Sequence, residues 1–180
     1  DTGRRETLPQ SIQLIAGRTA QEYNIRKRRK GAFWEDRYHA TAVQSGDHLM
    51  RCLVYIDLNM VRAGAVKHPS EWPFCGYNEI QVSPQRYTLI DRKLLMTLLG
   101  IDKSQEFSKT YNGWVDAVIK RGNNARDTKW TEGIAVGGKE FVEMVKNRLG
   151  YKAIGRKISG TEGDFELKED ISPYRAGFTG

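Results

Sequence analysis

The sequence predicts an α+β protein that is mostly helical. Apolar side chains recur at helical spacing over residues 8–30, 91–99, 103–120 and 139–149, and a shorter helical stretch covers 130–134. Residues 38–43 are instead rich in β-branched and aromatic side chains and end before Gly46, which indicates a short strand. With 39% apolar and 10% aromatic residues, we expect a packed core rather than disorder.

The charge balance favours a polyanionic partner. The net charge is +7 over 180 residues, and the longest basic run is Arg26, Lys27, Arg28, Arg29 and Lys30. A basic surface with no partner would show the same total. Five consecutive cations nevertheless make contact with nucleic-acid phosphates the better interpretation.

Cysteine usage and hydropathy point to a cytoplasmic protein. Cys52 and Cys75 are the only cysteines and lack the spacing of a metal site, which suits a reducing compartment. No apolar run approaches the ~20 residues that a membrane span needs, and no signal peptide is recognisable. The chain begins at Asp1 rather than methionine, so we expect a fragment or a processed form.

Local signals set the expected helix ends. Ser11 is a plausible N-cap of the first helix and Gly31 its C′ residue. Asp47 is expected to cap a second helix, from His48 to about Arg62. The predicted buried stripe of this second helix is Leu49, Leu53, Ile56 and Met60. Its opposite face carries Arg51, Tyr55, Asn59 and Arg62.

A change of character after Ser83-Pro84 marks the expected domain boundary. Residues 1–83 then form one domain, and residues 84–180 form a helical extension. The last thirty residues are rich in glycine and contain short strand-like pieces such as residues 164–167. They are expected to form a hairpin or to be only partly ordered.

Tyr55 and Asn59 are the residues whose chemistry is most suggestive. A tyrosine serves as a phosphodiester nucleophile when a covalent protein–DNA intermediate must conserve bond energy. A divalent metal commonly assists by polarising the phosphate, and the Asn59 side chain, one turn later, offers a hard oxygen ligand. The same spacing also occurs where an asparagine simply satisfies a half-buried phenol, and that arrangement is the commoner one.

Other candidates are weaker on their own. Trp34 can stack on unpaired bases beside Arg37, and it can equally be a core residue. The three histidines, His39, His48 and His68, are scattered and lack the spacing of a metal site. No P-loop, dinucleotide-binding fingerprint or nucleophile elbow is present.

The ordered blocks GAFWEDRYHATAV, YIDLNMVRAGAV and HPSEWPFCGY, within residues 8–80, resemble the REP-associated tyrosine transposases. These belong to the single-tyrosine HUH transposase superfamily of bacterial mobile elements. The resemblance implies that Tyr55 is the nucleophile and Asn59 a ligand of Mg²⁺ or Mn²⁺. It also implies that the strand and the tyrosine helix are the remnant of a ferredoxin-like domain. Met60 stands where the family motif has proline.

The family's other two metal ligands are a histidine pair on an upstream strand, which this sequence lacks. The resemblance therefore implies an incomplete metal site and a C-terminal portion of a transposase that does not cleave DNA by itself.

The expected function of the parent protein is DNA transposition by cleavage and joining of hairpin-containing single-stranded DNA. The reaction passes through a 5′-phosphotyrosyl intermediate, and a homodimer is compatible with it. The expected DNA contacts are Arg26, Lys27, Arg28, Arg29, Lys30, Trp34, Arg37 and Arg62. Two alternatives stay open: a catalytically inactive DNA- or RNA-binding remnant, and a protein-interaction role for residues 85–180.

Overall fold

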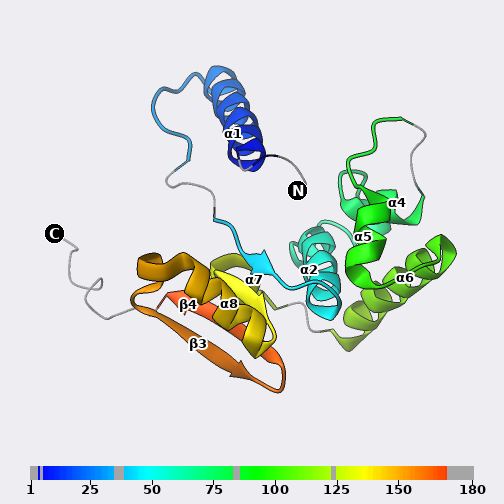
Figure 1. Cartoon of the computed structure of the whole chain (residues 1–180). Coiled ribbons are helices and arrows are strands. Elements are labelled where there is room, and N and C mark those ends of the chain that lie inside the picture. The colour runs from blue at the N-terminus through cyan, green and yellow to red at the C-terminus, as the bar shows by residue number, and fades with distance from the viewer. Residues whose placement is uncertain (1–3, 5, 35–38, 83–85, 123–124, 170–180) are drawn as a thin grey trace. The chain divides into compact units, whose positions relative to one another are not determined.

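The computed structural model describes residues 4, 6–34, 39–82, 86–122 and 125–169. Within them the chain is α+β, with a small four-stranded mixed sheet, which confirms the predicted fold class (Figure 1). The chain divides into two compact units, residues 1–40 and 41–180. Arg37, one of the expected DNA contacts, lies outside the described residues.

The first unit is built on one long helix, α1 (Thr7–Arg26). The helix begins before the expected N-cap Ser11, because Pro9 sits in the first turn, where its missing N–H has no helical partner to lose. It ends before the expected Gly31 in a Schellman motif. The N–H of Arg28 bonds to Ile25 O, and the N–H of Arg29 bonds to Asn24 O.

The basic run therefore begins at Arg26, the last residue of α1, and continues through the turn that follows, instead of filling the last turns of the helix. Arg28 is the left-handed C′ residue, with φ of +51°. Beyond it, Phe33 packs between Tyr23 and Trp34, with 4.7 Å between ring centroids on each side.

The second unit holds the remaining elements. Its helices are α2 (Asp47–Asp57), α3 (Asn59–Arg62), α4 (Gly76–Gln81), α5 (Arg92–Leu99), α6 (Ser104–Arg121), α7 (Lys129–Glu132) and α8 (Lys139–Leu149), with 3₁₀ turns η1 (Pro69–Glu71) and η2 (Gly150–Ala153). Its strands are β1 (Ala42–Val43), β2 (Ala135–Gly137), β3 (Arg156–Thr161) and β4 (Asp164–Glu169).

A helical core forms where α2, α4 and α6 meet. Its buried side chains are Met50, Val54, Leu58, Tyr77, Ile80, Phe107, Tyr111 and Val115. These come from both sides of the expected boundary at Ser83-Pro84, whose residues lie outside the described part of the chain.

The prediction of the buried stripe of α2 is wrong, because the buried face is shifted by one position along the helix and none of the four predicted residues is fully buried. Met50 and Val54 are buried, whereas Leu49, Leu53 and Met60 are only half-buried and Ile56 is 52% exposed. Helical spacing alone fixes which residues share a face, but the packing partners decide which face is covered. The single helix expected over residues 48–62 is also interrupted at Leu58, which lies between α2 and α3.

The sheet has strand order β1-β2-β4-β3. Strand β1 is parallel to β2, while β4 is antiparallel to both β2 and β3. The hairpin formed by β3 and β4 confirms the hairpin interpretation of the glycine-rich end, up to Glu169. Helix α8 packs on β2 and β4 and buries Val142 against Ala135 and Leu167 (Figure 1).

The expected strand over residues 38–43 is shortened to Ala42–Val43, although Tyr38 lies outside the described residues. The helical stretch expected at 130–134 is present as α7 but stops at Glu132, where the chain turns into β2.

Candidate functional site

A cavity of about 540 Å³ opens between the tyrosine helix and the segment that leads into α7. One wall comes from α2 and α3, and the opposite wall comes from residues 125–130 with part of α6. Four cationic side chains line it: Arg51, Arg62, Arg126 and Lys129. Its aromatic lining is Tyr55, Trp114 and Trp130.

Tyr55 is half-buried in the wall of this cavity rather than enclosed in the core. The guanidinium Cζ of Arg62 lies 3.9 Å from the centroid of its ring. The ring of Trp130 lies 6.3 Å from it, centroid to centroid, at 38°. Lys129 Nζ lies 5.1 Å from the Trp130 ring, so cations and aromatic rings alternate across the cavity.

Asn59 and Arg62 contact each other directly. Arg62 Nη2 donates to the backbone oxygen of Tyr55 at 2.5 Å and also to Oδ1 of Asn59. Burial lowers the pKa of the Arg62 guanidinium, and the neighbouring Tyr55 phenol raises it. An arginine begins so far above neutrality that it keeps its charge.

The expected metal ligand is therefore already occupied. The Asn59 amide oxygen accepts a hydrogen bond from a cation, and a divalent metal at the same oxygen would face that positive charge at contact distance. Among the described residues, no group of three or more His, Cys, Asp or Glu is placed to hold a metal ion. What the structure shows at Asn59 is a side-chain oxygen hydrogen-bonded to Arg62.

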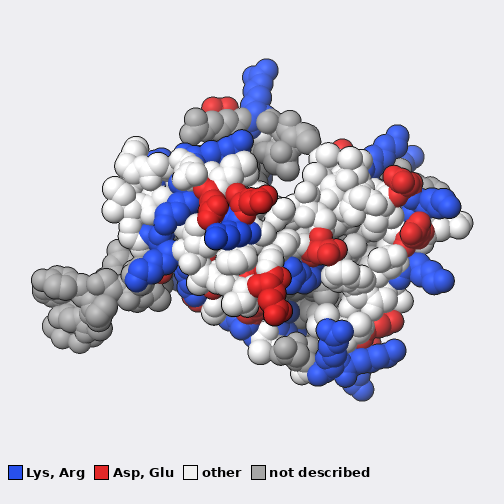
Figure 2. Space-filling view, turned by 60° about the horizontal axis from the view of Figure 1, so that its bottom comes forward, with Lys and Arg blue, Asp and Glu red and all other residues white. Residues whose placement is uncertain are grey.

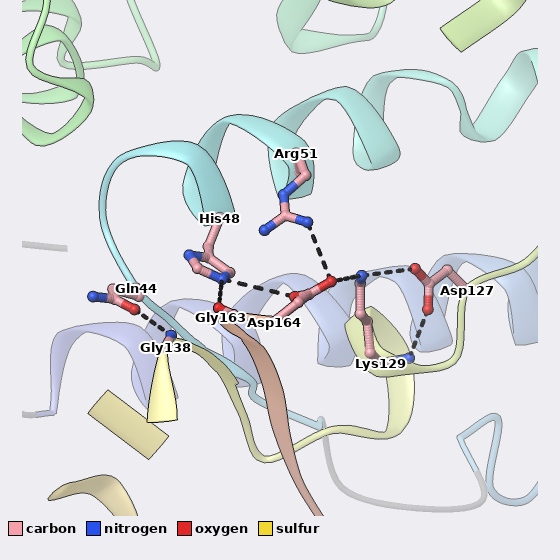
Figure 3. A network of polar contacts seen from close by, with 8 residues as sticks. All are labelled: Gln44, His48, Arg51, Asp127, Lys129, Gly138, Gly163 and Asp164. Carbon is pink, nitrogen blue, oxygen red and sulfur yellow. Dashed lines mark hydrogen bonds and ion pairs between the residues drawn. The ribbon is translucent and has the colours of Figure 1, made fainter. Parts of the chain in front are cut away.

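A network of charged groups fastens the two walls to the β3–β4 hairpin (Figure 3). Asp164 Oδ2 lies 3.2 Å from Arg51 Nη1 and 3.0 Å from Lys129 Nζ, and its Oδ1 lies 3.7 Å from His48 Nε2. Burial raises the pKa of Asp164, but the hydrogen bond from Lys129 and the charges of Lys129, Arg51 and His48 outweigh it and lower the pKa. Asp164 therefore stays ionised and holds Arg51 and Lys129 in place.

The four cations of the cavity differ in how their charge is balanced. Arg51 and Lys129 share Asp164, Lys129 also lies 3.3 Å from Asp127, and Arg126 lies 3.8 Å from Glu132. In the part of the chain that the structure describes, the hydrogen bonds of Arg62 go only to the uncharged oxygens of Tyr55 and Asn59.

The expected DNA contacts of the first unit form a separate group. Arg29 is held by a hydrogen bond to Ala32 O and lies over Tyr23, with 5.8 Å from Cζ to the ring centroid. Arg26 lies 3.9 Å from Glu22, and all five members of the basic run are exposed.

Trp34 combines the two roles that the sequence left open. Its indole N–H donates to Ala16 O at 3.0 Å, and it packs edge-on against Phe33. It is nonetheless 52% exposed, so it is anchored on α1 and still offers surface for stacking.

Lysine and arginine side chains are not gathered in a single patch of the surface. On the face drawn in Figure 2, lysines and arginines occupy several places, and acidic side chains lie among them. The cavity and the basic residues 26–30 are therefore better indicators of where a polyanion would bind than the net charge of the chain is.

Sequence reasoning missed Trp114, Lys129, Trp130 and Asp164. Their sole sequence signal is the Lys129-Trp130 pair close to Arg126, a basic-aromatic combination typical of nucleic-acid contacts. Asp164 gave no signal, because its partner Arg51 is 113 positions away.

Comparison with family models, with curated proteins and with solved structures finds no match to this chain. None of the helices in the described residues has the length and apolar character that crossing a membrane requires. Inference about function therefore depends on the residues themselves.

Proposed function

We propose that this chain binds single-stranded DNA in the Tyr55 cavity, and that Tyr55 is the nucleophile of a transposase-type strand transfer. The observation that carries the proposal is the position of Tyr55 in the wall of a cavity lined by four cations and two further aromatic side chains. The sequence blocks that resemble the REP-associated tyrosine transposases give the same residue the same role.

The chemistry of the cavity suits an unpaired strand. Aromatic faces bind bases whatever their sequence, and neighbouring cations track the phosphates. The exposed basic turn at residues 26–30 supplies further cations for backbone phosphates, and Trp34 supplies a second, half-exposed aromatic face.

The proposed reaction is a transesterification without net loss of bond energy. The Tyr55 phenolic oxygen attacks the phosphorus and its proton passes to solvent. The bond from phosphorus to the 3′ oxygen breaks, and that oxygen takes up a proton. The product is a 5′-phosphotyrosyl strand and a free 3′-hydroxyl, and attack by a second 3′-hydroxyl rejoins the DNA.

A non-catalytic nucleic-acid-binding protein is the second candidate. It is favoured by the engagement of Asn59 with Arg62, because the side-chain oxygen expected to bind a metal already accepts a hydrogen bond from a cation. The two candidates share the binding step and differ only in the covalent one.

Binding is tested by fluorescence anisotropy with a labelled single-stranded DNA that contains a hairpin. We expect affinity to fall as the salt concentration rises, because bound phosphates release counterions. Equal affinity at low and high salt, or no binding, contradicts the proposal.

The covalent step is tested with hairpin oligonucleotides that carry a 3′-bridging phosphorothiolate within a randomised linker. The 3′ thiolate is a better leaving group than an alkoxide, so the covalent step depends less on a metal ion or a general acid. We expect an adduct on Tyr55, detected by gel shift in detergent and peptide mass mapping, and none with Tyr55→Phe. DNA binding without any adduct favours the non-catalytic candidate.

A further inference from the structure

We infer that Arg62, held in place by Asn59, is the cation that binds the DNA phosphate beside Tyr55, in the position where a divalent metal was expected. The inference rests on the proposed function, since it identifies the group that receives the scissile phosphate. It assigns Asn59 as a positioning residue for Arg62 instead of a metal ligand.

The first step of the argument is the geometry of Asn59. Its Oδ1 accepts from Nη2 of Arg62, and the same nitrogen donates to the Tyr55 backbone oxygen. Two acceptors, separated by one helical turn, thus fix one end of the guanidinium. The remaining N–H groups belong to a side chain that lines the cavity.

The second step is charge. Arg51 and Lys129 share Asp164, Lys129 also lies near Asp127, and Arg126 lies near Glu132. Among the described residues, Arg62 is the cavity cation that no carboxylate balances. A phosphate entering the cavity therefore meets the least compensated positive charge at Arg62.

The third step is the position of Arg62 relative to the nucleophile. Its Cζ lies 3.9 Å from the Tyr55 ring centroid, so the guanidinium is stacked on the ring that carries the attacking oxygen. A phosphate in contact with the phenolic oxygen lies within reach of the guanidinium N–H groups. Arginine binds phosphate through paired N–H donors and keeps its charge throughout, which stabilises charge developing on the phosphate oxygens.

The two assignments of Asn59 give opposite results for Asn59→Asp. A carboxylate is a better ligand than an amide for Mg²⁺ or Mn²⁺, so a metal-binding Asn59 gains metal affinity in this variant. If Asn59 positions Arg62, the new carboxylate forms an ion pair with the guanidinium, and phosphate binding weakens. The matched control is Asn147→Asp, which makes the same change at an exposed position of α8.

The experiment measures the dissociation constant for hairpin-containing single-stranded DNA in EDTA, Mg²⁺ and Mn²⁺ at fixed ionic strength. We expect wild-type affinity to be the same within about twofold in all three. Loss of one charge-assisted hydrogen-bonding group weakens binding about tenfold in Asn59→Asp and in Arg62→Gln, whereas Asn147→Asp stays near wild type. Circular dichroism and thermal unfolding establish that each variant is folded.

Free Mn²⁺, followed by electron paramagnetic resonance, supplies the second readout. We expect Asn59→Asp to leave the Mn²⁺ signal of the protein solution unchanged. Mn²⁺-dependent DNA binding by the wild type, strengthened by Asn59→Asp, overturns the inference and leaves the proposed function standing. Failure of the wild type to bind DNA under any of these conditions overturns both.

Discussion

The hydroxyl of Tyr111 donates a 2.6 Å hydrogen bond to Oδ2 of Asp57, in the middle of the helical core. Asp57 is only 5% exposed and also accepts from the backbone N–H groups of Gly76 and Tyr77. One carboxylate thus joins α2, the start of α4 and α6, two residues beyond the proposed nucleophile.

Replacement of Asp57 by asparagine is predicted to remove a pH dependence of stability. Burial raises the pKa of Asp57, against the smaller opposing effect of its hydrogen bonds. The contribution of this group to stability is therefore complete below the unfolded-state pKa of about 4 and is lost as pH rises through the folded-state value. Asparagine keeps an acceptor oxygen and has no charge to bury.

We expect the free energy of unfolding of Asp57→Asn, relative to wild type, to rise from about pH 4 to about pH 8 in urea titrations. The exposed Asp102→Asn is the control, and a difference that does not change with pH contradicts the prediction.

The opposite pH behaviour is predicted for Asp164. Its pKa is lowered, so its contribution is present above the unfolded-state pKa and is lost as pH falls through the folded-state value. About a third of its side chain is exposed, so solvent screening keeps the cost of Asp164→Asn at neutral pH to roughly 1 kcal/mol. Urea titrations of the two proteins are expected to converge at acid pH. If the difference in free energy of unfolding between the two proteins does not change with pH, the ion pairs with Arg51 and Lys129 are not the cause of that difference.

Two glycine-to-alanine changes are predicted to act in opposite directions. At Gly160 an added Cβ would lie 2.2 Å from the Asp164 backbone oxygen, and φ is +137°. We expect Gly160→Ala to cost at least about 2 kcal/mol and to disrupt the β3–β4 hairpin. Gly113, inside α6, has open space around its Cβ position, so Gly113→Ala is expected to stabilise by about 0.5–1 kcal/mol. Thermal unfolding measures the change in stability of both variants. Equal changes in stability for Gly160→Ala and Gly113→Ala would contradict the prediction.

The basic turn is predicted to set part of the salt dependence of DNA binding. Lys27→Gln with Lys30→Gln removes two exposed cations while leaving Arg29, which is held on Tyr23. For a single strand, the slope of log affinity against log salt is expected to become shallower by roughly 0.7 for each lost contact. Lys93→Gln with Lys109→Gln makes the same charge change in α5 and α6. Similar slopes for the two double variants would mean that only net charge is involved.

Trp130 is predicted to contribute by stacking on a base. Trp130→Ala is expected to weaken binding of single-stranded DNA by about 1–3 kcal/mol at every salt concentration, since stacking involves no counterion release. Tyr151, 79% exposed on η2 and not part of the cavity lining, provides the control variant Tyr151→Ala. Unchanged affinity in Trp130→Ala would show that the DNA does not enter the cavity. Anisotropy titrations with one labelled oligonucleotide suffice for both variants.

Elements set by local interactions were predictable from the sequence. Helix α8 has the predicted limits, and α5 begins as expected, because the Asp91 carboxylate accepts from the Leu94 N–H at 3.0 Å. The helix ends at Leu99, before the left-handed Gly100 with φ of +68°, which is the same kind of short-range signal. Caps and turns involve residues a few positions apart, so a single sequence contains the information.

Features that depend on distant partners were not predictable. Strand β2 is only the three residues Ala135–Gly137, and its strand character comes from pairing with β1 and β4. The same holds for the covered face of α2, which is decided by the helices packed on it. In the candidate site, helical spacing correctly grouped Tyr55 with Arg62. Nothing near either residue indicated that Trp130 and Asp164 would complete the cavity.

The ion pair between Arg51 and Asp164 has a consequence for biosynthesis. Its partners are 113 residues apart, and Asp164 is the first residue of the last strand in the described chain. A ribosome therefore completes the tyrosine helix long before the carboxylate that secures Arg51 exists. Closing so long a loop is slow compared with forming local helices. Until Asp164 has been synthesised, Arg51 and Lys129 lack this counter-charge, so their ion pairs with the hairpin are among the last contacts of the site to form.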